Sequence, residues 1–142
     1  MGNPADETSR AQEVGETIAR FVDAVNRGDQ SEAIGCFTAD ATIVEDIAPF
    51  RWQGPDACAQ WMAAMWENAQ RMALTGVVMD LGPAIRIEVE GKFAYALFGG
   101  RLRLMAPTGE LRSDGQLTFT LETGGTGWRI SAMTWSGPAP GA

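Results

Sequence analysis

Apolar residues recur at helical spacing through the first part of the chain. Between residues 9 and 27 the intervals are three and four, which predicts an amphipathic helix. Its apolar positions are Val14, Ile18, Phe21, Val22 and Val25. Gly28 would end this helix, and Asp29 with Glu32 three residues later resembles a capping box that opens a second, short helix. We expect residues 1–8 to form a flexible tail in front of one domain over residues 9–138.

A strand and a third helix follow. Residues 41–46 carry β-branched side chains and predict a strand, and residues 49–55 predict a loop that holds Trp52. Pro55 and Asp56 then open a helix that runs to about residue 72. Its large apolar residues fall near one side and are Trp61, Met62, Met65 and Trp66.

The second half of the chain has the pattern of β-strands separated by turns. Candidate strands cover residues 77–81, 85–90, 93–106, 111–122 and 128–136. Turn residues lie between them at Gly82-Pro83, Glu90-Gly91, residues 107–109 and Gly124-Gly125. Helices first and long strands last predict an α+β fold, with three N-terminal helices packed on one face of an antiparallel sheet.

Charge and composition exclude several functions. The net charge is −7, from 18 acidic and 11 basic residues, and no basic cluster offers a surface for phosphates. We therefore expect no nucleic acid and no membrane as partners. The N-terminal stretch is polar and acidic, unlike a secretory signal, and no apolar run is long enough to span a bilayer, so we expect a cytoplasmic location.

The chain has no histidine, which removes the commonest metal ligand and the usual general base. Its two cysteines, Cys36 and Cys58, form no CxxC pair and fit buried free thiols. We expect neither a metal nor an organic cofactor, because no cluster supplies enough ligands. Any proton transfer would then depend on carboxylates, Tyr95, Lys92, arginine or water.

The order of these elements resembles the nuclear transport factor 2-like superfamily, and within it the SnoaL-like proteins. The matching segments are residues 21–29 (FVDAVNRGD), residues 37–42 (FTADAT), Gly54, residues 127–130 (GWRI) and Trp135-Ser136. The resemblance implies a strongly curved sheet wrapped around the helices into a cone with a central apolar pocket, and usually a homodimer. The superfamily contains isomerases, dehydratases, epoxide hydrolases and polyketide cyclases beside non-catalytic binding modules, so the fold alone does not give the function.

The resemblance to the steroid isomerase-like branch implies a catalytic carboxylate at the end of the first strand. Ungapped counting places it at Glu45, and matching the acidic pair places it at Asp46. Strand alternation favours Glu45, because Ala41 and Ile43 share its face. A carboxylate at the mouth of an apolar pocket would have a raised pKa and could move a proton near neutrality.

The side chains that would assist such a base differ from those at the same positions in the relatives. The positions that donate hydrogen bonds to an enolate in that branch fall on Phe21 and near Leu117, which cannot donate. The epoxide hydrolase positions read Arg101, Arg103 and Ile130, without the required acids. Histidines of many relatives are replaced by Ala132 and Thr134.

Aromatic and sulfur-containing side chains would then line a pocket for a small apolar molecule. The candidate ligand-binding residues are Phe21, Trp52, Trp61, Met65, Trp66, Phe98, Phe119 and Thr134. Arg101 and Arg103 share a strand face, where the default expectation is a solvated surface position. The alternatives are binding to acids across a dimer interface or to an anionic group of a ligand. Met133 and Trp135 alternate away from Ile130, which predicts an apolar patch and a homodimer through the outer face of the sheet.

Two functions remain open at this point. The first is a cofactor-independent enzyme that uses Glu45 or Asp46 for proton transfer in an isomerisation, cyclisation or dehydration of an apolar substrate. The second is a non-catalytic dimeric module for ligand binding or assembly. A pocket that holds one of these carboxylates beside a hydrogen-bond donor would favour the enzyme.

Overall fold

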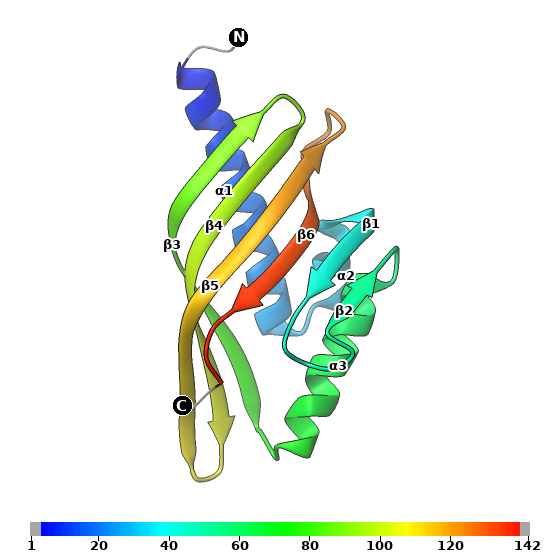
Figure 1. Ribbon diagram of the computed structural model, residues 1–142, viewed down its shortest axis with the longest axis vertical. Helices are drawn as coiled ribbons and strands as arrows, with labels where there is room; N and C mark the ends of the chain where they lie inside the picture. Colours follow the sequence, from blue (N-terminus) through cyan, green and yellow to red (C-terminus); the bar gives the residue numbers. More distant parts are fainter. Residues whose placement is uncertain (1–3, 140–142) are drawn as a thin grey trace.

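The helices come first and most of the sheet last, as the sequence predicts. In the computed structural model, which describes residues 4–139, the elements are α1 (Pro4–Arg27), α2 (Gln30–Gly35), β1 (Phe37–Val44), β2 (Arg51–Gln53), α3 (Ala57–Arg71), β3 (Gly76–Glu90), β4 (Phe93–Ala106), β5 (Gly109–Thr123) and β6 (Trp128–Ser136). The α+β prediction is confirmed. Figure 1 shows the long strands curving across one side of the helices.

The six strands form one sheet in the order β2-β1-β6-β5-β4-β3. All neighbouring pairs are antiparallel except β1 and β6, which are parallel. The sheet does not close, because β2 and β3 remain at its two edges. Its concave face is covered by the helices, and the opposite face is the front of the view in Figure 1.

The first helix begins earlier than the apolar pattern predicts. Residues 4–8 of the predicted tail belong to the first turns of α1, and residues 1–3 lie outside the described residues. Acidic Asp6 and Glu7 lie in the first turn, where they favour the positive end of the helix dipole. The domain predicted for residues 9–138 therefore starts within a helix that is already formed.

β3 is one strand where the sequence predicts two. Its pairing with β4 continues on both sides of Gly82-Pro83, with register shifts between Leu81 and Arg86. Gly82 lies so close to β4 that an added Cβ would come within 2.8 Å of the Gly99 carbonyl oxygen. The ladder with β4 therefore outweighs the local preference of Gly-Pro for a turn, and the strand bends without ending.

A bulge in β6 changes which side chains face the core. Register with β5 shifts so that Thr120 pairs with Ala132 while Leu121 pairs with Ile130, which leaves Ser131 as the extra residue. The alternation changes phase there, and Ile130, Met133 and Trp135 all point to the concave face. The predicted outward patch of Met133 and Trp135 is therefore wrong, since their exposed fractions are only 4% and 6%.

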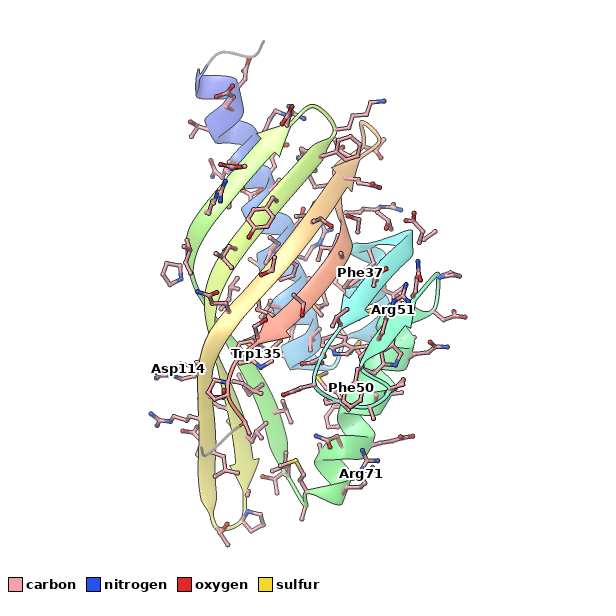
Figure 2. All side chains as sticks on the ribbon, viewed as in Figure 1. Phe37, Phe50, Arg51, Arg71, Asp114 and Trp135 are labelled. Carbon is pink, nitrogen blue, oxygen red and sulfur yellow. The ribbon has the colours of Figure 1, made fainter. Side chains whose placement is uncertain are left out.

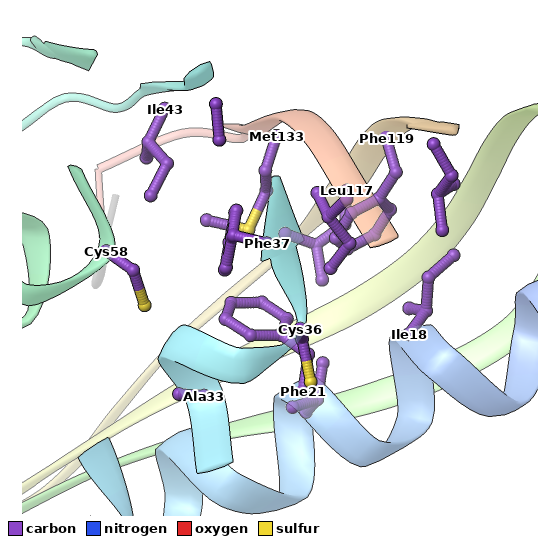
Figure 3. Close-up of a cluster of buried hydrophobic side chains, with 14 of the residues drawn as sticks. Ile18, Phe21, Ala33, Cys36, Phe37, Ile43, Cys58, Leu117, Phe119 and Met133 are labelled. Carbon is purple, nitrogen blue, oxygen red and sulfur yellow. The ribbon is translucent and has the colours of Figure 1, made fainter. Parts of the chain in front are cut away.

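Phe21 lies at the centre of the hydrophobic core. Its ring packs edge-on against Phe37 at 5.1 Å between centroids and against Phe119 at 6.3 Å, and it is tilted against Trp61 at 5.8 Å. Figure 3 shows how side chains from the helices and the sheet converge around it. Because Phe21 touches both the deep core and Trp61, it joins the packed interior to the region described next.

The convex face carries ion pairs at the distal end of the β4–β5 hairpin. Arg101 binds Asp114 with a nitrogen–oxygen distance of 2.7 Å, and Arg103 binds Asp80 at 2.5 Å and Glu110 at 3.3 Å. Figure 2 shows Asp114 on this hairpin, away from the helices. These arginines therefore pair with acids of their own chain on the surface of the sheet, which agrees with the default expectation of a surface position.

Candidate functional site

Glu45 directly follows the last residue of β1. Ala41 and Ile43 point into the core with exposed fractions of 1% and 0%, and the alternation carries the Glu45 side chain to the same face. Its backbone N–H donates to the Phe50 carbonyl at 3.1 Å, which holds the start of the following loop. The next residue, Asp46, is exposed. The geometry therefore agrees with the strand alternation, which favours Glu45 over Asp46 as the residue on the core-facing side of β1.

The Glu45 carboxyl group accepts a hydrogen bond from the indole N–H of Trp61 on α3. Burial disfavours the charged form and raises the pKa of Glu45 to about 7. The Trp61 hydrogen bond opposes this rise in pKa, because it stabilises the carboxylate, and the negative charge of Asp46 adds to it. Glu45 can thus both accept and release a proton near neutral pH.

The carboxyl group lies in the wall of an apolar cavity of about 60 Å³. The other lining residues come from α1, α3 and the four long strands: Phe21, Val22, Val25, Asn26, Trp61, Met62, Met65, Trp66, Val77, Met79, Leu102, Leu117, Met133 and Trp135. Glu45 is the only ionisable side chain among these described residues, and no arginine or lysine is present. The cavity therefore suits an apolar molecule and disfavours an anion.

Helix α3 provides the aromatic and sulfur-containing side of this cavity. Trp61 and Met65 are four residues apart, and so are Met62 and Trp66, which puts the two pairs on neighbouring parts of one helix face. Trp61 is buried, whereas Trp66 is 54% exposed and lies at the rim. The aromatic face expected from the sequence is thus present and extends from the core to the opening.

The sheet closes the opposite side of the cavity, partly through Met133 and Trp135, which the sequence did not reveal as lining. Leu117 pairs with Trp135 across β5 and β6. Leu117 faces the cavity through the regular alternation of β5, and Trp135 faces it because of the bulge at Ser131. Two glycines leave room for the Trp135 indole: an added Cβ would lie 2.7 Å from it at Gly115 and 2.9 Å from it at Gly137. A local alternation pattern carries no signal for the bulge, so this wall could not be predicted.

The structure brings together five of the predicted site residues in one cavity, and the first four are Phe21, Glu45, Trp61 and Met65. Trp66 also lines it. The remaining ones lie elsewhere. Phe98 and Phe119 belong to the packed core behind Phe21, where their rings meet edge-on at 6.4 Å.

Trp52 and Thr134 are also outside the lining of the cavity. Trp52 is in strand β2 and not in a loop, pairs with Ile43 of β1, and is buried in the core. Thr134 lies between inward-facing Met133 and Trp135, so its side chain points to the convex face beside Val44. Both differences arise from strand pairings between segments that are distant in the sequence.

Asn26 was missed because a polar residue at a helix end resembles a simple surface position. Its amide donates to the Met79 carbonyl at 2.9 Å and accepts from the Met79 N–H at 3.0 Å. These two bonds fasten the end of α1 to the edge strand β3. Asn26 therefore fixes the separation of two cavity walls, and one of its two amide N–H donors is already used.

Other chemistry is limited in the described part of the chain. Within residues 4–139 no three His, Cys, Asp or Glu side chains gather as a metal site would require. Cys36 and Cys58 are buried and free, as the sequence predicts, and burial raises the pKa of the Cys58 thiol to about 12. No helix in the same range is long and apolar enough to cross a bilayer.

Comparison with solved structures shows the same fold in several proteins. A protein of unknown function from Mycobacterium tuberculosis superposes with a TM-score of 0.77 at 20% identity, over 96% of this chain and 76% of that one. A nuclear transport factor 2-like superfamily protein from Salmonella enterica gives 0.73 at 19% identity, over 95% of each chain. A type 2 hexachlorocyclohexane dehydrochlorinase gives 0.75 at 13% identity, over 95% and 90%.

These identities are low, so the superpositions establish the fold and nothing finer. A search of curated proteins found no significant match. The family model described as the SnoaL-like domain matches residues 6–134, which is nearly the whole chain and includes every residue described in the cavity lining except Trp135. With the curved sheet, the three helices and the cavity between them, this match shows that the chain belongs to the SnoaL-like domain family.

Proposed function

We propose that this protein is an enzyme that removes a proton from an apolar small molecule, with Glu45 as the base. The observation that supports the proposal is the Glu45 carboxyl group in the wall of an apolar cavity, held by Trp61. A carboxylate with a pKa of about 7 is half deprotonated at neutral pH and is a stronger base than an exposed glutamate. Desolvation thus prepares the group for proton transfer.

Elimination is the reaction class that this cavity supports best. One N–H of the Asn26 amide and the indole N–H of Trp61 are engaged, and among the described lining side chains the remaining N–H donors are the second N–H of Asn26 and the indoles of Trp66 and Trp135. Such a cavity offers little to a developing enolate oxygen. In an elimination Glu45 takes the proton, the C–H electron pair becomes the double bond, and the leaving group departs with its own bonding pair.

The names of two structural neighbours are consistent with this class. One is the dehydrochlorinase, and another, from Novosphingobium aromaticivorans, is assigned as a scytalone dehydratase and superposes with a TM-score of 0.74 at 11% identity, over 91% of this chain and 84% of that one. Both names describe eliminations. We extend the reaction type to this chain as part of the proposal, and not their substrates.

Proton abstraction by Glu45 can be tested with 5-nitrobenzisoxazole. A base takes its C–H proton, the N–O bond breaks, and the coloured product 2-cyano-4-nitrophenolate forms. We expect the rate to rise with pH around the pKa of Glu45 and to level off above it. Glu45→Gln removes the base while keeping the shape, and should lower the rate by about 10²–10⁴-fold.

The matched control is Glu67→Gln, an exposed glutamate on α3 outside the described cavity linings. It should leave the rate unchanged. Equal rates for the Glu45→Gln variant and the unmodified protein would contradict the proposal.

A second candidate is a non-catalytic ligand-binding module, and the engaged donors of Asn26 and Trp61 favour it. The two functions differ in what Glu45→Gln does. In a binding module, the change would alter ligand affinity but no turnover of the benzisoxazole would be detected before or after it.

We also propose that two copies pair through the convex face of the sheet. Beyond the ion pairs, this face presents small uncharged side chains, among them Thr42, Thr118, Ala132 and Thr134, which neighbour one another through the strand pairing. The described helices lie on the other face (Figure 1), so this one is free for a second copy. Thr118→Arg should then yield a monomer in light scattering, and a monomeric unmodified protein would contradict the proposal.

A further inference from the structure

A second compartment lies next to the cavity described above. It has a volume of about 140 Å³ and shares Glu45, Met65, Val77 and Leu102 with the first cavity. We call the first the inner compartment and the second the outer compartment. Because four side chains belong to both walls, the two compartments meet at Glu45 and Met65.

The outer compartment lies at the C-terminal end of α3, between this helix and the paired strands β3 and β4. Asn68 and Met72 line the compartment from the helix, and Val77 and Leu104 line it from the sheet. Figure 2 places Arg71 at this end of the helix, but the residue is not part of the lining. The loop after β1 adds Asp46 and Ile47, so the residue next to Glu45 in the chain faces the second space.

The two compartments differ in their chemistry. The outer compartment adds two oxygen acceptors, the carboxylate of Asp46 and the amide oxygen of Asn68. Within residues 4–139 Asp46 makes no ion pair or hydrogen bond, and the Asn68 amide reaches only the Met72 sulfur at 3.5 Å. No basic side chain in this part of the chain lines either compartment. The outer compartment therefore attracts a group that donates hydrogen bonds or carries positive charge, and repels an anion.

We propose that the substrate is an elongated molecule that occupies both compartments. Its apolar part fills the inner compartment beside Glu45, and its other end, an amine or a hydroxyl group, binds Asp46 and Asn68 in the outer one. This inference rests on the proposed role of the inner compartment as the substrate site. It adds the substrate class: amphiphilic, without negative charge, and long enough to pass Met65.

Inert probes test the compartments without any turnover. Calorimetric titration compares toluene, an apolar ring without a polar end group, with 4-phenylbutylamine, 4-phenylbutan-1-ol and 4-phenylbutanoate, which share one apolar part and differ in their end group. We expect the amine to bind most tightly and the alcohol next. The carboxylate should bind at least about tenfold more weakly than the amine, because it faces Asp46 without a counter-charge.

Two substitutions locate the end group. Asn68→Phe fills the outer compartment and should weaken amine binding about tenfold or more, while toluene binding stays within about twofold. Asp46 is exposed, so Asp46→Asn should fold normally, and it should reduce the preference for the amine over the alcohol. The control is Gln70→Ala, an exposed position on α3 outside both linings, which should change neither.

The outcomes separate this inference from the proposed function. If toluene binds but the three longer probes bind equally, or Asn68→Phe and Asp46→Asn leave their affinities unchanged, the outer compartment is not a subsite and the role of Glu45 stands. If no probe binds, both the subsite and the inner compartment as a substrate site are refuted.

Discussion

Trp61 donates its indole hydrogen bond to Glu45, a residue sixteen positions earlier in the chain. One partner directly follows a strand and the other lies in the first half of α3, so this contact joins the end of the strand to the helix in the wall of the cavity. The bond favours the charged carboxylate, whereas burial favours the neutral one. The balance of these two effects determines the pKa of Glu45. A substitution that alters either the hydrogen bond or the burial should therefore change this pKa.

The first prediction concerns stability and pH. The folded-state pKa of Glu45 is raised from 4.5 to about 7, so the stability associated with its bound proton is complete below pH 4.5 and is lost as the pH rises through about 7. Glu45→Gln mimics the neutral form at every pH. Relative to this variant, the unmodified protein should lose at most about 3 kcal/mol between these pH values. Urea unfolding of both proteins at pH 5 and 8 measures the difference, and a constant difference would show that the pKa is not raised.

The second prediction changes the donor. Trp61→Phe keeps an aromatic ring but removes the N–H that stabilises the carboxylate, so the pKa of Glu45 should rise above about 7. The midpoint of a pH–rate profile for proton abstraction should move to higher pH, and the rate at neutral pH should fall. Carbon NMR titration of the carboxyl group measures the same shift directly.

The matched control for this change is Trp128→Phe. Trp128 is as buried as Trp61, each being 5% exposed, but its ring stacks under Arg10 far from Glu45. Both variants should lose comparable stability from the smaller ring. Only Trp61→Phe should move the midpoint, and an equal movement in both would point to a general loosening of the fold.

The third prediction concerns the room left for Trp135. Gly115→Ala places a Cβ 2.3 Å from the Ser136 carbonyl oxygen and 2.7 Å from the Trp135 ring, so the backbone or the ring must move. We expect a loss of about 1–3 kcal/mol in the free energy of unfolding, as in other overpacked sites, together with weaker ligand binding. Gly99→Ala is the control, because its Cβ would meet nothing within 4 Å. Thermal unfolding measures both, and equal stability of the two variants would contradict the crowding at Gly115.

The fourth prediction concerns the connection between α1 and β3. Asn26→Ala removes both hydrogen bonds to the Met79 backbone and should cost about 1–3 kcal/mol of stability. Asn26→Asp keeps the acceptor for the Met79 N–H and loses the donor to its carbonyl. Amide hydrogen exchange at Met79 should therefore accelerate strongly in Asn26→Ala and less in Asn26→Asp. Unchanged exchange in both would mean that the strand is held by other contacts.

The sequence was sufficient where local periodicity determines the structure. The inward direction of Glu45 follows from its spacing to Ala41 and Ile43, and the aromatic face of α3 follows from the spacing of Trp61 and Met65. Both are consequences of one element acting alone, with a period of two in a strand and 3.6 in a helix. For the same reason the helices and most strands could be placed without knowledge of their partners.

Features that depend on two elements could not be predicted in this way. The extra residue Ser131 exists only relative to the register of β5, and it reverses the expected direction of Met133 and Trp135. Trp52 becomes a core residue because β2 pairs with β1 beside Ile43. The outer compartment likewise combines a loop, a helix end and two strands, and no single segment carries its pattern.

Glu45 and Asp46 are consecutive residues, yet one lines both compartments and the other only the outer compartment. A single peptide bond therefore links them mechanically, and any molecule that restrains the Asp46 side chain also restricts the backbone that aims the Glu45 carboxyl group. A substrate held at its far end would lose less entropy when the proton moves, which favours a higher turnover number in addition to tighter binding. Truncated substrates should consequently react more slowly even when they saturate the cavity.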